Sequence, residues 1–76
     1  MKPRSKAEKL TQRASRLEAK GRWQEAVDLY EEAIDADPTW SAPLYDLGLL
    51  YKRRRKWKES FKYNRRATQV NKENIW

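Results

Sequence analysis

The sequence repeats itself with a period of 34 residues, and this period limits the possible folds more than any other feature. Four positions carry the same residue type in both copies: Leu10 and Leu44, Trp23 and Trp57, Glu25 and Glu59, and Ala33 and Ala67. Small residues recur at positions where two elements must approach closely, and large apolar residues recur at positions that pack around this contact. We therefore expect a single domain over residues 1–76 in which one structural unit occurs twice, over about 7–40 and about 41–74.

The first copy predicts two helices. Ser5 and Glu8 have the spacing of a capping box, so we expect a first helix over about Lys6 to Lys20. Apolar residues at helical spacing begin again at Trp23 and predict a second helix that ends before Pro38. A short link joins the two, so we expect them to pair as an antiparallel hairpin.

The second copy predicts another hairpin. Thr39 or Ser41 can cap the third helix, and Pro43 is tolerated only in its first turn, where the missing N–H is not needed. The fourth helix has a less regular apolar stripe, which comprises Trp57, Phe61, Tyr63, Ala67 and Val70. No segment shows the alternation of a strand. The sequence therefore predicts an all-α fold of four antiparallel helices.

A helix-turn-helix unit of 34 residues resembles the tetratricopeptide repeat family. The residues that fit the family pattern are Ala26, Tyr30 and Pro38 in the first copy and Leu44, Leu47, Gly48 and Tyr51 in the second. The residues that depart from it are Arg13 and Ala14 in the first copy and Ser60, Asn64 and Lys72 in the second. The resemblance implies a helical-hairpin α-solenoid fragment whose pattern relaxes toward both ends, because terminal repeats face solvent on one side.

The resemblance also implies a protein-binding groove lined by the first helix of each hairpin. The residues at these positions are Thr11, Gln12, Ser15, Tyr45, Asp46, Leu49, Lys52 and Arg53. Tyr45, Leu49 and Arg53 follow one another at four-residue spacing and form one ridge, which we expect to contact a peptide or a partner helix. The alternative is that Tyr45 and Leu49 pack against the first helix.

One subclass of this family grips a C-terminal carboxylate with Lys and Asn side chains. The corresponding residues in this sequence are Thr11, Ser15 and Asp46. Because these cannot form the clamp, and because Asp46 would repel a carboxylate, we reject that class of ligand.

The sequence offers little to catalysis. It contains no His and no Cys, so the usual general base at neutral pH and the two commonest zinc ligands are absent. The acidic residues around Glu31 and Asp35 are typical of a solvated helix face rather than of a metal site. We expect no enzymatic activity, no cofactor and no bound metal.

Charge is distributed in three blocks. Residues 1–22 carry a net charge of +6, residues 23–46 of −7 and residues 47–76 of +8. Besides Lys52 and Arg53, the last block contains a basic patch of Arg54, Arg55, Lys56, Lys58, Lys62, Arg65 and Arg66. An acidic protein partner is one expectation for this patch. The competing one is phosphate binding on RNA or the ribosome through residues 52–66, which we rank lower because no base-reading motif is present.

The aromatic residues bear on packing and assembly. We expect Trp23 and Trp57 to pack in the core or to close their hairpins, and Trp40 to pack across the junction between hairpins. Arrays of this kind usually need three or more repeats. Two repeats leave a flank of the fourth helix uncovered, and its apolar residues are Phe61, Tyr63, Val70 and Trp76. The chain is therefore expected to belong to a longer array, to serve as a scaffold segment, or to form a homo-oligomer.

The same composition bears on location. No apolar run is long enough to span a bilayer, and the charged N-terminal stretch lacks the apolar segment of a secretory signal. We expect a cytoplasmic protein without a membrane partner.

Overall fold

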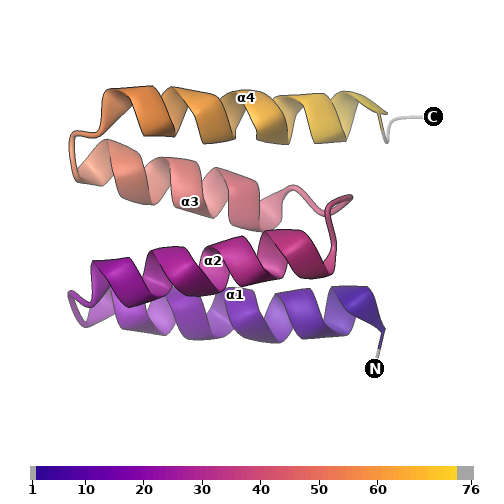
Figure 1. The fold of residues 1–76 in the computed structure, drawn as a ribbon, viewed down its shortest axis with the longest axis horizontal. Coiled ribbons are helices and arrows are strands. Elements are labelled where there is room, and N and C mark those ends of the chain that lie inside the picture. Colours follow the sequence, from indigo (N-terminus) through magenta and orange to yellow (C-terminus); the bar gives the residue numbers. More distant parts are fainter. Residues whose placement is uncertain (1, 74–76) are drawn as a thin grey trace.

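A computed structural model describes residues 2–73 of the chain, which form four α-helices in two antiparallel hairpins (Figure 1). The helices are α1 (Pro3–Ala19), α2 (Trp23–Ala36), α3 (Ala42–Arg53) and α4 (Trp57–Glu73). Helix α1 packs on α2, α2 on α3, and α3 on α4, and residues 2–73 contain no strand. The predicted fold class, an all-α helical-hairpin repeat, is confirmed. None of the helices in this part of the chain has both the length and the apolar character needed to cross a membrane.

The turns inside the two hairpins have the same hydrogen-bond geometry. In the first, the N–H of Arg22 donates to the carbonyl of Leu17 at 2.9 Å; in the second, the N–H of Lys56 donates to the carbonyl of Tyr51 at 2.8 Å. Both bonds are the 6→1 bond of a Schellman motif, which requires a left-handed residue one position earlier. That residue is Gly21, with φ +79°, in one hairpin and Arg55, with φ +60°, in the other.

The start of α1 differs from the prediction. The helix begins at Pro3, and no side chain caps it, so the predicted capping box at Ser5 is wrong. A proline in the first turn has its φ fixed near the helical value and lacks an N–H that would need a partner, which lets the helix begin earlier. At α3, Pro43 lies in the first turn, as predicted. Ser41 occupies the N-cap position, but its side chain makes no capping hydrogen bond and its hydroxyl donates to Asn71 Oδ1 at 2.6 Å, so the predicted cap is wrong.

One core cluster runs through all four helices. Its buried residues are Ala14, Ala26, Val27, Tyr30, Ile34, Leu44, Leu47, Leu50, Tyr63 and Ala67. Each large apolar side chain among them stabilises the fold by about 1.5–3 kcal/mol relative to an exposed one. Helices α3 and α4 approach closely at Gly48, where an added Cβ would lie 2.5 Å from the Asn64 side-chain oxygen and would force that side chain to move.

The buried stripe of α4 also differs from the prediction. It consists of Ser60, Tyr63 and Ala67, with Val70 half-buried at its end. Trp57 is 61% exposed and Phe61 is 66% exposed, so the predicted hairpin-closing role of Trp57 is wrong. The prediction that Tyr63 lies on an uncovered flank is wrong for the converse reason: it faces the core. Trp76, which the sequence also predicts on that flank, lies outside the described residues.

Trp23 shows why Trp57 is exposed although the two occupy equivalent positions. Trp23 is half-buried against the core, and the guanidinium of Arg54, from the turn of the second hairpin, lies 4.4 Å from its ring centroid. The second hairpin therefore covers Trp23. Among residues 2–73, no further hairpin lies next to Trp57.

Candidate functional site

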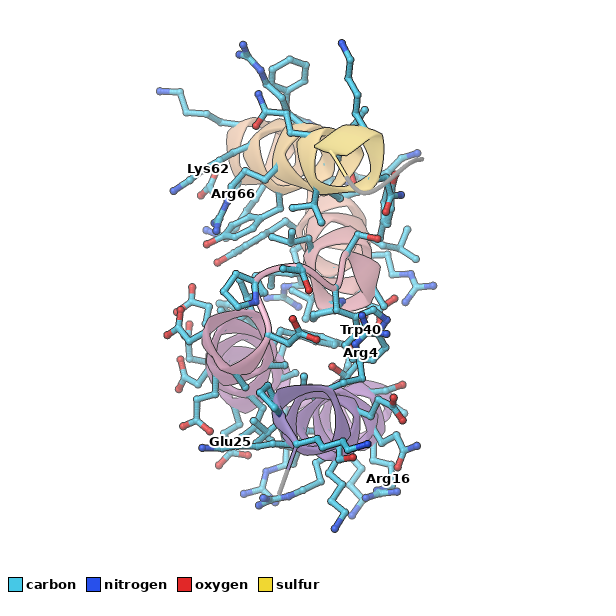
Figure 2. All side chains as sticks on the ribbon, turned by 90° about the vertical axis from the view of Figure 1, so that its right-hand side faces the viewer. Arg4, Arg16, Glu25, Trp40, Lys62 and Arg66 are labelled. Carbon is cyan, nitrogen blue, oxygen red and sulfur yellow. The ribbon has the colours of Figure 1, made fainter. Side chains whose placement is uncertain are left out.

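The sides of α1 and α3 that lie outside the core define a surface, which we call the α1/α3 face. Its residues are Gln12, Ser15, Glu18, Tyr45, Asp46, Leu49, Lys52 and Arg53. At the start of both helices, the guanidinium of Arg4 lies 4.9 Å from the ring centroid of Trp40 (Figure 2). At their ends, Arg53 Nη1 pairs with Glu18 Oε2 at 3.0 Å. The two contacts join the first helix to the second hairpin and to the segment that leads into it.

Two apolar side chains of α3 stand out on this face. Tyr45 is 41% exposed and Leu49 is 43% exposed, and neither belongs to a core cluster. The alternative that they pack against the first helix is therefore not supported. Asn71 of α4 donates a hydrogen bond from Nδ2 to the Tyr45 hydroxyl at 3.1 Å and so fixes one end of the ring. Large apolar side chains held in place at the surface are typical of contact sites.

Arg53 takes part in a hydrogen-bonded chain that links three helices. Glu18 of α1 accepts a bond from Arg53 of α3 at 3.0 Å and another from the buried Tyr30 hydroxyl of α2 at 3.2 Å. Burial, followed by the charge of Glu18, raises the pKa of Tyr30, so this hydroxyl stays a donor over the physiological range. Arg53 therefore already has one ion-pair partner within the fold, Glu18, although much of its side chain stays exposed.

Asp46 gives the face its electrostatic character. The residue is half-buried, and burial followed by the nearby charge of Glu18 raises the pKa of its carboxyl, while Arg53 opposes the shift. A second negative group brought close to this pair would raise the electrostatic cost further. This arrangement agrees with the rejection of a carboxylate-gripping clamp at the same positions.

The remaining predicted site residues on α1 are placed unequally. Gln12 and Ser15 are exposed. Thr11 is only 8% exposed, and its hydroxyl donates to the carbonyl of Ala7 at 2.8 Å. Thr11 therefore has little surface to offer a ligand. On α3, Lys52 is exposed beside Arg53.

The predicted basic patch is exposed but is divided among different sides of the molecule. Lys62 and Arg66 lie on one side of α4, each 5.4 Å from the ring centroid of Tyr63 (Figure 2). Arg54 covers Trp23 of the first hairpin, while Arg65 lines a hollow on the opposite side of α4 from the core. The other predicted members, Arg55, Lys56 and Lys58, are exposed in the turn and at the start of α4.

Sequence reasoning missed a second polar centre, in the link between the hairpins. Asp37 Oδ1 accepts a hydrogen bond from the Thr39 hydroxyl at 2.6 Å, and its Oδ2 accepts one from Arg4 Nε at 2.8 Å. These bonds, the Thr39 hydroxyl first, lower the pKa of Asp37. Asp37 therefore organises the link rather than extending the acidic face of α2. The described residues contain no group of three or more acidic side chains, His or Cys suited to a metal ion.

Trp40 supports the same link. Its ring packs against the small cluster of Ala7, Leu10 and Ala33, so its apolar partners in this cluster all come from the first hairpin. Trp40 lies at the junction as predicted, but it anchors the link to the first hairpin, and Arg4 covers the ring.

Comparison with known proteins agrees with this geometry. A family model described as tetratricopeptide repeat matches residues 7–40, a span that covers most of α1, all of α2 and the link to α3. Neither the curated proteins nor the solved structures contain a significant match. Over residues 7–40 the chain is therefore similar to the tetratricopeptide repeat family, and the paired hairpins and their shared turn geometry agree with this similarity.

Proposed function

We propose that the chain is a non-enzymatic protein–protein interaction module that binds a peptide or a partner helix on the α1/α3 face. Repeats of this family generally act as interaction modules without catalytic activity. The observation that carries the proposal is the exposed pair of Tyr45 and Leu49, one helical turn apart on α3. Burying such a pair under a ligand releases water from apolar surface, and this is the main source of affinity in small interfaces.

The charges of the face limit the kind of ligand. Lys52 and Arg53 follow the ridge and attract an acidic ligand residue at that end, whereas Asp46 and Glu18 disfavour one beside them. The proposed ligand therefore places apolar side chains on Tyr45 and Leu49 and an acidic residue near the end of α3. A cytoplasmic location forms part of the proposal, because a chain without Cys needs no oxidising compartment to fold.

Peptide display tests the proposal directly. Twelve-residue random peptides are selected on the intact chain and then measured against a variant that combines Tyr45→Ala, Leu49→Ala and Arg53→Ala. We expect the dissociation constants to rise at least about tenfold, since truncated interface anchors commonly cost 2 kcal/mol or more. The matched control is Phe61→Ala, which removes an exposed aromatic ring from another surface. If the selected peptides bind the triple variant unchanged, the ligand site lies elsewhere.

Phosphate binding by the basic residues of positions 52–66 is the second candidate function. Its support is the exposure of most of these side chains, and the acidic face of α2 weakens it by lowering the local potential. A titration with random-sequence RNA at near-physiological salt separates the two candidates. Micromolar or tighter binding would favour RNA, and its absence would leave the protein-binding proposal.

A further inference from the structure

The side of α4 that faces away from the core is an unusual surface for a small basic chain. We call it the outer face of α4 and define it by Trp57, Phe61, Arg65, Thr68, Gln69 and Lys72; Asn64, which borders it, also lies against Gly48 of α3. Trp57 and Phe61 are the most exposed large apolar side chains of the described residues. Next to them, a hollow of about 500 Å³ is lined by the other members of the face together with Phe61 and Asn64.

The repeat shows what a surface at this position accommodates. Shifted by one period, Phe61 and Thr68 correspond to Val27 and Ile34 of α2, as Trp57 corresponds to Trp23. Val27 is 3% exposed and Ile34 is 5% exposed, because the second hairpin packs on that side of α2. In the first copy, the equivalent side of α2 packs against a helix. The outer face of α4 therefore lies at a position where this repeat can hold a helix.

Helix α3 packs on this side of α2, and its buried residues show which pattern a docked helix needs. Leu44, Leu47 and Leu50 are each no more than 1% exposed and belong to the same cluster as Val27 and Ile34. A helix that docks on α4 in the same way needs apolar residues at this three-residue spacing. Such a stripe is the usual form of helix-in-groove recognition.

The charge of the outer face selects an acidic helix. Arg65 and Lys72 line the hollow, and Lys58 lies one turn before Phe61 on the same side of α4. All three are exposed, and none of them belongs to an ion pair within the described residues. Glu59, by contrast, is half-buried and lies on another side of the helix. Interfaces arrange opposite charges across from one another, so Asp and Glu belong on the flanks of the occupant.

A second copy of this chain does not meet this requirement. In a head-to-tail stack, α1 of the next copy would take the place of α3, with Arg13 and Arg16 at the positions of Leu47 and Leu50. The stack would bring these arginines to the basic outer face of α4 and would leave like charges at the interface. Pairing α4 with α4 brings together two basic surfaces in the same way, and both arrangements are costly.

From these observations we infer that the outer face of α4 docks an acidic amphipathic helix of a partner protein, in the register in which α2 holds α3. This surface lies apart from the α1/α3 face, and the two can be occupied independently. Trp57 and Phe61 supply the apolar anchors, and Lys58, Arg65 and Lys72 attract the acidic flanks. The interaction weakens as salt rises, because exposed charge pairs are screened.

The test uses a synthetic 16-residue helical peptide with Leu at the spacing of Leu44, Leu47 and Leu50 and Glu at the other surface positions. Titration into the isotope-labelled full chain is followed by amide chemical shifts and by calorimetry. We expect saturable binding, with the largest shifts in α4. Two further peptides serve as controls: one has Lys in place of Glu, and the other has the same composition with the Leu spacing scrambled. We expect both to bind at least about tenfold more weakly.

Variants of the chain make the result decisive. Phe61→Glu alters an exposed residue, so the fold is retained, and we expect it to weaken binding of the acidic peptide at least about tenfold. Changing Arg65→Glu and Lys72→Glu together is expected to reverse the preference between the Glu and Lys peptides. Leu49→Glu is the matched control on the α1/α3 face and leaves this binding unchanged, although it disrupts the separately proposed site.

Several results would overturn the inference. These are no binding at millimolar peptide, equal binding by Phe61→Glu, or shifts confined to α1 and α3. Light scattering and RNA titration cover the other occupants. If the chain forms a dimer that Phe61→Glu dissociates, the occupant is a second copy; if RNA shifts the same α4 amides at near-physiological salt, it is a nucleic acid.

Discussion

The two hairpins have the same turn, but the residue with positive φ destabilises one turn more than the other. Gly21 and Arg55 are equivalent in the repeat, and both have positive φ. Glycine adopts this conformation without steric cost, whereas a residue with a Cβ is destabilised by about 1–2 kcal/mol. The second hairpin is therefore closed by a residue that strains its own turn.

This difference predicts opposite effects of two substitutions. Arg55→Gly should raise the free energy of unfolding by about 1 kcal/mol, and Gly21→Ala should lower it by about the same amount. No atom lies within 4 Å of a Cβ added at Gly21, so the loss would come from conformation alone. Urea unfolding followed by circular dichroism measures both. Lys56→Gly is the control for the lost charge, because Lys56 has no positive φ; a gain as large as that of Arg55→Gly would contradict the explanation.

Asp37 predicts how acid destabilises the link between the hairpins. The hydrogen bonds from Thr39 and Arg4 lower its pKa, so they stabilise the fold above the ordinary aspartate pKa. This contribution is lost as the pH falls through the lowered pKa of the folded state. We expect Asp37→Asn to cost about 1–2 kcal/mol at pH 7 and to flatten the acid limb of the stability curve.

The measurement for Asp37 is the free energy of unfolding by urea between pH 2 and pH 7. Asp35→Asn is the control, since Asp35 is an exposed acid two residues earlier. An equal loss in both variants would show that the net charge, and not the bonding of Asp37, sets the acid response.

The helices differ in how well their sequences predict them. The stripe from Trp23 to Ile34 predicts α2 well, because its apolar residues are the ones the core buries. The stripe of α4 misleads for two reasons: Trp57 and Phe61 have the composition of core residues but lie at the surface, and the small polar Ser60 is buried. Periodicity identifies a helix but does not show which of its faces another element covers.

The candidate site was predictable to a similar degree. The exposure of Tyr45 and Leu49 follows from the repeat, since both fall outside the apolar stripe of α3. The burial of Thr11 does not, because Thr11 occupies the position that the exposed Tyr45 has in the other copy. The bonding of Asp37 to Arg4 joins residues 33 positions apart and has no sequence signal of its own.

The half-buried carboxyl of α3 gives a prediction for that helix. Because burial and Glu18 raise the pKa of Asp46, its ionisation opposes folding, and stability falls as the pH rises from the ordinary aspartate pKa to the raised one. We expect Asp46→Asn to raise the free energy of unfolding at pH 7 and to leave it nearly unchanged at pH 3. Urea unfolding at the two pH values measures this, with Asp28→Asn as an exposed control. A loss of stability at pH 7 would mean that Asp46 is held by favourable bonds instead.

The whole molecule is a one-dimensional stack, and its cooperativity should follow from that. Each helix packs mainly on its neighbours in sequence, and the Cα atoms fill a slab of 36 × 29 × 14 Å. Contacts between sequence neighbours keep the contact order low, which favours fast folding. In such stacks stability is close to a sum of unit and neighbour terms, so the ends can open while the middle stays closed.

Native-state hydrogen exchange tests this view of the stack. Helices α2 and α3 each pack on two neighbours, whereas α4 packs mainly on α3 and leaves Trp57 and Phe61 in water. Helix α1 also lies at an end, but Arg4 and Glu18 tie it to the link and to α3. The amides of α4 should therefore exchange fastest among the helices, through openings that leave the first hairpin intact. Equal protection in all four helices would mean that the two hairpins unfold as one unit, with no independent terminal helix.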